Sequence, residues 1–427
     1  MKRNYLLLII LLSVTKSGYA ENGIAAGSIT ESGIAAPDSF SSVKKIPPRF
    51  LSFTGMGGVV LPTNHYVREG NCIPWYSAAS FKFGTYSAGD SWEDFAYGMP
   101  YNGIGIYAAG FFNKKALGAP VSLYLFQGGD WKRFSPNWSL RYELNLGMSF
   151  NWKPYDIFDN PDNIALGSAS NVHVGVSVSM KRRLNDRWDV YAGMGIAHFS
   201  NGAQRLPNKG VNLLSPFVEL VYNVSPGAVD YSRRAEFAPP PLEKRIDYDV
   251  LFTITSRQIR IDTAGTGLPQ HIVDRNFKVF GLSYATMFVN SYNYRWGPSM
   301  ELVYDESSDV KIWRQIRPQD GQYYDRVKLG LIYKRFSVGL SLKGEMTYRR
   351  VSFFANVGYN LLHGNAYDFR VYQIIGAKAY LKDNIFGAFG IRAHKFTKAQ
   401  YLYWSIGYTI KGNPLTKKDR YINRLLP

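Results

Sequence analysis

Apolar and polar residues alternate along most of the chain with the two-residue period of a β-strand. In the run NWSLRYELNLGMSFNW, residues 137–152, a large apolar side chain stands at every even position from Trp138 to Trp152. Ordinary strands have about five or six residues, whereas a strand that crosses a membrane needs about 9 to 11. Aromatic residues at both ends of the run suit the two interfaces of a bilayer. The pattern therefore predicts membrane-spanning strands.

The same pattern predicts eight strands in each half of the chain. In the first half they lie near 49–61, 73–86, 101–113, 119–133, 137–152, 169–182, 187–200 and 212–224. In the second half they lie near 247–261, 276–290, 294–305, 326–348, 349–361, 369–382, 385–396 and 400–411. The strand at 326–348 changes its apolar phase between Tyr333 and Phe336, which indicates a bulge or an additional hairpin.

Short and long connections alternate along the chain, as they do in outer-membrane barrels with short periplasmic turns and long extracellular loops. The segments SPN and RLND are short, whereas the connections at 153–168, 201–211 and 306–323 are long. With a periplasmic amino terminus, the strand at 187–200 is expected to end at the outer side of the membrane.

A Pro-rich linker at 225–246 separates the two sets of strands and is too long for a periplasmic turn. The predicted fold class is all-β, with two tandem eight-stranded transmembrane antiparallel barrels at 49–224 and 247–412. One sixteen-stranded barrel with a looping connection stays open as the alternative. The remaining segments are predicted as a signal peptide at 1–20, a flexible leader at 21–48 and a carboxy-terminal tail at 413–427.

Composition agrees with a barrel. Aromatic residues make up 15% of the chain, with 31 Tyr, and the mean hydropathy is only −0.20, as expected when half of each strand faces a polar interior. The net charge of +18 is scattered along an exported chain, which favours phosphorylated surface lipid over nucleic acid as the partner. The single cysteine, Cys72, excludes an intrachain disulfide.

Polar residues stand on the apolar face of two neighbouring strands, at their outer ends. His198 and Ser200 share the parity of Met194, and Asn212 on the next strand shares the parity of Val218. Uncompensated polar groups in hydrocarbon cost several kcal/mol. Either lipid headgroups solvate these residues at the rim, or the residues form a catalytic group. In the second case Ser200 is the nucleophile, His198 the base and Asn212 the group that orients the imidazole.

The stretch HFSNGAQRLPNKGVN, residues 198–212, resembles the signature of the lipid A 3-O-deacylases of Gram-negative outer membranes, the PagL-like acyloxyacyl hydrolases. The resemblance extends over about residues 49–224. It implies that His198 and Ser200 are the catalytic pair and that Asn208 contributes to an oxyanion hole. It also implies that the loop supplies further oxyanion contacts at Asn201, Gly202 and Ala203.

One position departs from that family, because its deacylases carry glutamate where this chain has Asn212. Asparagine can accept a hydrogen bond from imidazole but cannot stabilise an imidazolium by charge. The departure therefore predicts slower hydrolysis or none. Glu219 is not expected to replace the missing carboxylate, because its parity directs it into the barrel as a structural residue.

Other polar residues are interpreted more simply. Arg205 and Lys209 are candidates for binding lipid phosphates, with solvated loop charges as the alternative. His173 is predicted to be an interior polar residue. In the second half His394 aligns with His198 but Phe396 takes the serine position, so that half is predicted to be non-catalytic.

The leading functional hypothesis is an outer-membrane esterase that removes an ester-linked acyl chain from lipid A or a related glycolipid. The alternatives are a phospholipase that uses the same residues, or a non-catalytic barrel that acts as a channel, adhesin or scaffold. No cofactor and no metal is predicted. The predicted partners are the outer membrane and lipid A or another outer-leaflet lipid, not nucleic acid, with a homodimer left open.

Overall fold

The computed structural model describes residues 47–64, 66–67, 73–225, 240–261, 271–316, 318–319, 321, 323–348, 350–363, 370–395 and 398–415. The predicted signal peptide lies outside the described residues, as do Cys72, Phe396 and most of the predicted leader, linker and tail. No helix in the described ranges has the length and apolar character needed to cross a membrane.

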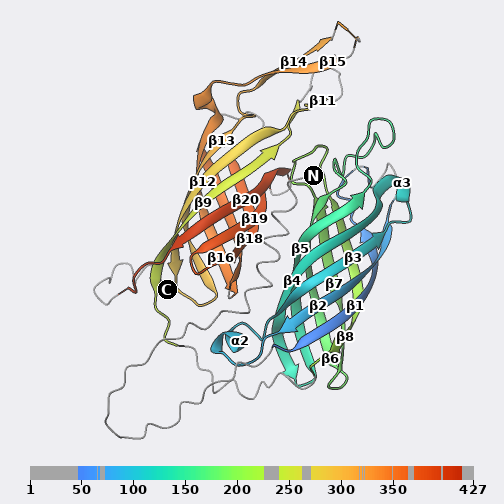
Figure 1. Ribbon diagram of the computed structural model, residues 1–427, viewed down its shortest axis with the longest axis vertical. Helices are drawn as coiled ribbons and strands as arrows, with labels where there is room; N and C mark the ends of the chain where they lie inside the picture. The colour runs from blue at the N-terminus through green and yellow to red at the C-terminus, as the bar shows by residue number, and fades with distance from the viewer. Residues whose placement is uncertain are drawn as a thin grey trace, which may run out of the picture.

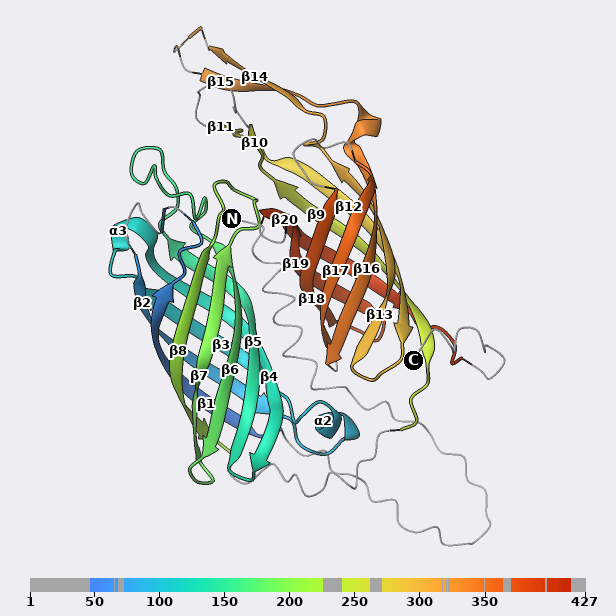
Figure 2. The ribbon, with the colours of Figure 1, turned by 180° about the vertical axis from the view of Figure 1, so that it is seen from behind.

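Eight antiparallel strands close the first barrel, which runs from blue to green in Figures 1 and 2. They are β1 (Arg49–Val60), β2 (Trp75–Tyr86), β3 (Tyr101–Gly110), β4 (Gly118–Ser135), β5 (Trp138–Trp152), β6 (Asn171–Arg183), β7 (Trp188–Ser200) and β8 (Val211–Asn223). Pairing of β1 with β8 closes the barrel. Two short helices, α2 (Trp92–Ala96) and α3 (Lys114–Leu117), lie in the connections at opposite ends of the strands.

Eight further strands close a second barrel, in which β20 pairs with β9. They are β9 (Arg245–Arg257), β12 (Phe277–Val289), β13 (Tyr294–Asp305), β16 (Phe336–Tyr348), β17 (Val351–Leu362), β18 (Val371–Tyr380), β19 (Ile385–His394) and β20 (Lys398–Ile410). The two-barrel prediction is therefore confirmed, and the sixteen-stranded alternative is wrong.

Two hairpins rise from the loop end of the second barrel, β10 (Arg260–Ile261) with β11 (His271–Ile272) and β14 (Lys311–Ile316) with β15 (Tyr323–Lys328). The second of these is the additional hairpin that the change of apolar phase indicated, and it corrects the bounds of the strand predicted at 326–348. Residues up to Lys328 belong to β15, and a short helical turn, η3 (Ile332–Arg335), precedes β16. The apolar phase slips between Tyr333 and Phe336 because this turn rotates successive side chains by a different angle from a strand.

The alternation of each strand sorts the side chains onto two faces. Phe81, Ile106 and Val218 are among the exposed large apolar residues that cover the outside of the first barrel. Inside, the buried Lys82 ammonium lies 2.8 Å from a Glu143 oxygen and 2.9 Å from a Glu219 oxygen. Glu219 is therefore an interior structural residue, as predicted.

Further buried polar and aromatic residues fill both interiors. His173 stacks on Phe199 with ring centroids 4.6 Å apart, which confirms it as an interior residue. In the second barrel Lys378 Nζ lies 3.0 Å from an Asp249 oxygen, and Arg392 lies 2.7 Å from Glu301. An eight-stranded barrel has an interior just wide enough for side chains to fill it. These interiors are therefore packed with side chains rather than left as open pores.

Trp152 does not belong to the outer aromatic belt as its parity predicted. Only 3% of its surface is exposed, and its ring packs 4.9 Å from that of Phe199 inside the barrel. Its indole nitrogen donates a hydrogen bond to the Ser149 hydroxyl. The preceding Asn151 has a left-handed backbone with φ of 64°, which breaks the alternation at the end of β5. The tryptophan therefore turns inward.

Candidate active site

The structure brings the three predicted catalytic side chains together at the loop end of the first barrel. His198 on β7 lies directly opposite Asn212 on β8. The imidazole Nε2 is 2.9 Å from the Ser200 hydroxyl, and Nδ1 is 2.6 Å from the Asn212 side-chain oxygen. Cross-strand neighbours and residues two apart on one strand are the pairs that a sheet places side by side on one face.

Thr63, just beyond β1, fixes the direction of the Asn212 amide. The amide nitrogen donates a hydrogen bond of 2.8 Å to the Thr63 hydroxyl, so the amide oxygen faces His198. An oxygen acceptor requires the proton of the neutral imidazole to sit on Nδ1. The other nitrogen, Nε2, is then free to accept the Ser200 proton. Asparagine therefore sets the tautomer needed for a general base, although it adds no charge.

Ser200 is buried although its parity directs it out of the barrel. Only 5% of its surface is exposed, compared with 53% for Ile196, which is on the same face of β7. The serine is therefore withdrawn from solvent at the end of a strand whose outer face is otherwise apolar and exposed.

The loop at 201–210 folds through three residues with left-handed backbones. Gly202 and Ala203 each have φ of 61°, and Gly210 has φ of 77°. This conformation costs a non-glycine residue about 1 to 2 kcal/mol, so the surroundings must hold Ala203 in place. The Asn201 side chain contributes by donating a hydrogen bond of 2.8 Å to the Arg205 carbonyl oxygen.

Asn208 presents an unused donor beside the serine. Its side-chain oxygen accepts a hydrogen bond of 2.9 Å from the backbone nitrogen of Asn201, the residue that follows Ser200. Its Nδ2 is buried and has no acceptor among the described residues. A buried amide without an acceptor is costly unless a ligand supplies one. The Asn208 amide is therefore a candidate side-chain donor to an oxyanion.

The other predicted oxyanion residues differ in what they offer. The backbone and side-chain donors of Asn201 are engaged by Asn208 and Arg205, so this residue shapes the loop. In the described part of the chain, the backbone N–H groups of Gly202 and Ala203 donate to no protein acceptor. These two groups therefore remain available to a ligand.

Gly210 lies against the His198 imidazole. A β-carbon added to it would come within 2.7 Å of His198 Cε1, and its φ of 77° independently favours glycine. Asn64 holds the Gly210 carbonyl oxygen through a hydrogen bond of 3.0 Å from its side-chain nitrogen. The loop thus closes directly over the edge of the ring. Glycine is therefore needed at position 210 for its close approach to the ring as well as for the turn.

Thr63, Asn64 and Gln258 contact this site but were not predicted to. Thr63 is 149 residues from Asn212 along the chain, and Asn64 is 146 from Gly210. No local pattern links residues so far apart. The segment LPTN, which directly follows the first strand, gave one weak signal of these contacts. Polar residues at the end of a barrel strand are expected to form hydrogen bonds with the neighbouring loops.

The candidate phosphate ligands lie on the same rim, and both Arg205 and Lys209 are exposed. Partial burial lowers the pKa of the Lys209 ammonium, and repulsion from Lys398 and Arg260 lowers it further. Cations from both barrels therefore share this region.

His394 occupies a different face from His198. It has the parity of Arg392, whose guanidinium pairs with Glu301 inside the second barrel, and it is 7% exposed. The chain has one additional residue between the shared Gly-Ile pair and the histidine in β19. A shift of one residue moves a side chain to the opposite face of a strand. The expected alignment of His394 with His198 is therefore wrong in three dimensions.

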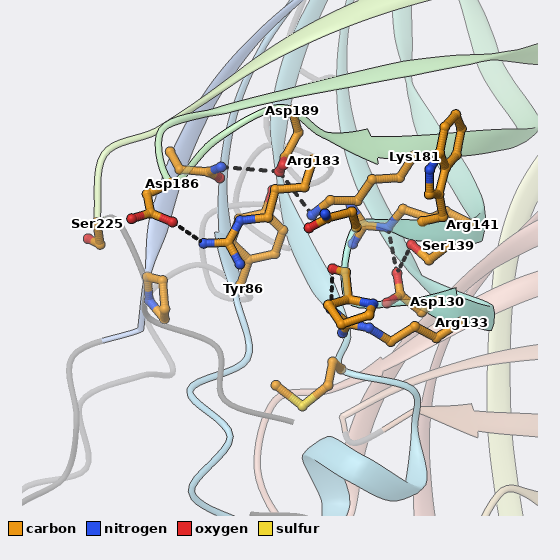
Figure 3. A pocket seen from close by; sticks show the side chains of 16 residues that line it. Tyr86, Asp130, Arg133, Ser139, Arg141, Lys181, Arg183, Asp186, Asp189 and Ser225 are labelled. Carbon is orange, nitrogen blue, oxygen red and sulfur yellow. Dashed lines mark hydrogen bonds and ion pairs between the residues drawn. The ribbon is translucent and has the colours of Figure 1, made fainter. Parts of the chain in front are cut away.

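A separate hollow lies at the opposite, short-turn end of the first barrel, around Tyr86 and Arg133 (Figure 3). Its charged side chains pair with one another: Arg141 lies 2.8 Å from Asp130 and Lys181 lies 2.9 Å from Asp189. This hollow is far from Ser200 and offers no arrangement for hydrolysis. Among the described residues, no group of three or more His, Cys, Asp or Glu is placed to hold a metal ion.

Residues 246–412 match a family model described as acyloxyacyl hydrolase, C-terminal domain. This match bears out the family predicted from the motif, but on the second barrel rather than on residues 49–224. No curated protein matches the chain.

Two solved structures are remotely similar to this chain. The toluene transporter TbuX of Ralstonia pickettii is 8% identical, with 86% of this chain and 90% of that chain covered and a TM-score of 0.18. The siderophore receptor PirA of Pseudomonas aeruginosa is 10% identical, with 86% and 81% covered and a TM-score of 0.23. Likenesses with such low TM-scores carry no argument about the function of this chain.

Proposed function

We propose that the protein is an outer-membrane esterase of lipid A or a related glycolipid, because residues 246–412 match a family model described as acyloxyacyl hydrolase, C-terminal domain. The observation that carries the proposal is the chain of hydrogen bonds from Asn212 through His198 to Ser200 in the first barrel. The family match and the hydrogen-bonded serine are on different barrels. The proposal therefore rests on two independent observations.

The proposed reaction begins when Ser200 attacks the carbonyl carbon of an acyl ester. His198 Nε2 takes the hydroxyl proton as the new carbon–oxygen bond forms. The carbonyl electrons move onto oxygen, where Asn208 Nδ2 and the free N–H groups of the loop stabilise the negative charge. The ester bond then breaks, and the imidazolium gives the proton to the departing sugar oxygen. Water, deprotonated by the same imidazole, attacks the carbonyl carbon of the acyl-serine. The bond to Ser200 breaks, the serine oxygen regains the proton from the imidazolium, and the fatty acid leaves.

The site faces the region in which acyl chains of a lipid lie. The exposed apolar residues Met194 and Ile196 precede His198 on the same face of β7. A lipid can approach such a site sideways from the bilayer, without an aqueous pocket. The exposed cations Arg205 and Lys209 on the same rim favour a phosphorylated headgroup.

The packed interiors argue against a channel. In the first barrel the ion pairs of Lys82 with Glu143 and Glu219 lie across the interior. A homodimer gains no support either, because a second barrel of the same chain already contacts the site loop through Gln258.

The test is lipid A mass spectrometry on cells and on purified protein in detergent micelles. Wild-type protein is expected to release fatty acid from lipid A, and Ser200→Ala is expected to abolish release. Ser170→Ala, at the same rim but outside the catalytic hydrogen bonds, is the matched control. Folding is checked by the heat-dependent shift of barrel mobility on gels. Fatty acid release that survives Ser200→Ala would contradict the proposal.

Phosphatidylethanolamine in the same micelles tests the phospholipase alternative. Both substrates present esters to the same serine, so only their relative rates separate the two activities. Faster hydrolysis of phosphatidylethanolamine, lost in Ser200→Ala, would keep the esterase but change its substrate.

A further inference from the structure

The second barrel contacts the catalytic loop of the first through Gln258, which directly follows β9. The backbone nitrogen of Gln258 donates a hydrogen bond of 3.0 Å to the Ala203 carbonyl oxygen. Its side-chain oxygen accepts a hydrogen bond of 2.8 Å from the backbone nitrogen of Leu206. One residue of the second barrel therefore holds two points of the loop, on either side of Arg205.

Leu402 on β20 provides a second contact, against Gly202. A β-carbon added to Gly202 would come within 2.4 Å of Leu402 Cδ2 and 3.2 Å of the Leu402 backbone nitrogen. Figure 2 shows the end of β20 beside the loop that joins β7 to β8. The loop backbone is therefore enclosed on the side that faces the second barrel.

Burial along the outer faces of β9 and β20 marks the same contact. On β20, Ile406 is 58% exposed whereas Leu402, on the same face, is 5% exposed. On β9, Ile254 is 50% exposed, but Ser256 and Gln258 beyond it are buried. On both strands, outward-facing residues of the second barrel therefore lose their exposure toward the 201–210 loop.

A contact at the opposite end helps to keep the two barrels in register. The ring of Trp92 in α2 lies 4.9 Å from that of Tyr292, in the turn between β12 and β13. The Tyr97 hydroxyl donates a hydrogen bond of 3.3 Å to the Tyr292 carbonyl oxygen. With contacts at both ends, the second barrel is held against the first rather than tethered by the linker alone.

We propose that the second barrel completes the hydrolytic site, with Gln258 as a positioning residue that holds the 201–210 loop in its oxyanion-binding form. The inference rests on the proposed esterase function. Ala203 has a left-handed backbone, and the hydrogen bonds within the loop all involve Asn201, which pairs with Gln204, Arg205 and Asn208. The bonds with Gln258 add a restraint at Ala203 itself and at Leu206. They keep the N–H groups of Gly202 and Ala203 and the Asn208 amide aligned beside Ser200.

The test compares Gln258→Ala with Gln258→Glu in the full-length protein, with lipid A in detergent micelles as the probe. Alanine removes the acceptor for the Leu206 N–H, whereas glutamate retains an oxygen at the same distance. Because the loop acts on the transition state, Gln258→Ala is expected to lower kcat about tenfold with KM nearly unchanged. Gln258→Glu is expected to restore most of kcat. Gln315→Ala, on the distant β14, is the matched control.

A second readout follows the loop without using activity. Trypsin cuts after Arg205 and Lys209 only if the loop can leave its place, so Gln258→Ala should raise cleavage there several-fold. Leu402→Ala is expected to act in the same direction by removing the contact with Gly202. The cleavage sites are identified by mass spectrometry of protein that has first been shown to be folded by gel mobility.

These measurements separate the two proposals. If Ser200→Ala abolishes activity but Gln258→Ala changes neither kcat nor cleavage, the esterase stands and the role of the second barrel is wrong. If Gln258→Glu is as impaired as Gln258→Ala, the acceptor role is wrong. If lipid hydrolysis survives Ser200→Ala, the esterase proposal fails, and the inference built on it fails as well, whatever trypsin shows of the loop.

Discussion

The two barrels present a histidine at the same end of their seventh strands but on opposite faces. In the first barrel His198 faces outward and meets Ser200 and Asn212. In the second barrel one additional residue turns His394 toward the interior. A single insertion in a strand is therefore enough to separate a histidine from a lipid-facing site. We therefore propose that the second barrel keeps the fold and serves the first without a catalytic histidine of its own.

The largest expected difference comes from removing each histidine in turn. His198→Ala removes the general base and is expected to lower kcat by about 10³-fold to 10⁴-fold. His394→Ala is expected to leave kcat unchanged, because this side chain faces the interior of the second barrel. Fatty acid release from lipid A measures both. Equal losses in the two variants would show that the barrels share the chemistry.

Asn208 gives the next largest effect. Asn208→Ala removes an oxyanion donor, and kcat is expected to fall by about 10²-fold to 10³-fold. Asn208→Asp keeps the oxygen that accepts the Asn201 N–H but loses the donor, so it should be no better than alanine. An active Asn208→Asp variant would mean that Asn208 only shapes the loop.

Gly210→Ala tests the close approach of the loop to the imidazole. The new β-carbon would contact His198 Cε1, and the left-handed backbone would be strained by about 1 to 2 kcal/mol. Displacement of the ring is expected to lower kcat by about 10-fold to 10²-fold. Gly110→Ala is the control, because a β-carbon there, at the same end of the barrel, meets no atom within 4 Å.

Thr63 tests how the amide of Asn212 is oriented. Thr63→Val keeps the shape of the side chain but removes the oxygen that accepts from Asn212, so the amide can turn over. A reversed amide favours the wrong tautomer of His198, and kcat is expected to fall about tenfold. Thr63→Ser should restore it. Similar kinetics for valine and serine would exclude this role.

The smallest expected effect is a gain. Asn212→Asp adds the charge that this chain lacks and keeps an oxygen acceptor for His198, so the imidazolium formed during reaction is stabilised. We expect kcat to rise several-fold in the lipid A assay. A fall in kcat would indicate that the cost of placing a carboxylate at the lipid edge exceeds the gain.

Strand parity accounts for much of what the sequence predicted. Two-residue alternation is a local property, so it placed His198, Ser200 and Asn212 outward and Glu219 inward without knowledge of the fold. It failed at Trp152, where the left-handed Asn151 changes the alternation without a strong local signature. In the strand predicted at 326–348, the slip of the apolar phase had indicated a bulge or an additional hairpin, and the structure has an additional hairpin followed by a helical turn.

The residues that hold the site in place could not be predicted from the sequence, for a different reason. Thr63 and Asn64 meet Asn212 and Gly210 only where β1 closes the first barrel against β8. Gln258 meets the loop only where the second barrel lies against the first. Alternation predicts the face of the sheet on which each residue lies. It does not predict how far one strand is shifted along its neighbour, or how one barrel packs against another, and these two quantities decide which distant residues are in contact.

A reactive group on the outer wall of a barrel meets molecules that travel within the plane of the membrane. Its encounters depend on how much of the leaflet consists of the target and on how fast neighbours exchange by lateral diffusion. The bulk concentration of the substrate in the surrounding water then has little influence on the rate of encounter. Dilution of the substrate with inert detergent or lipid, at constant bulk concentration, should therefore slow the outward-facing Ser200 in proportion to the mole fraction that remains.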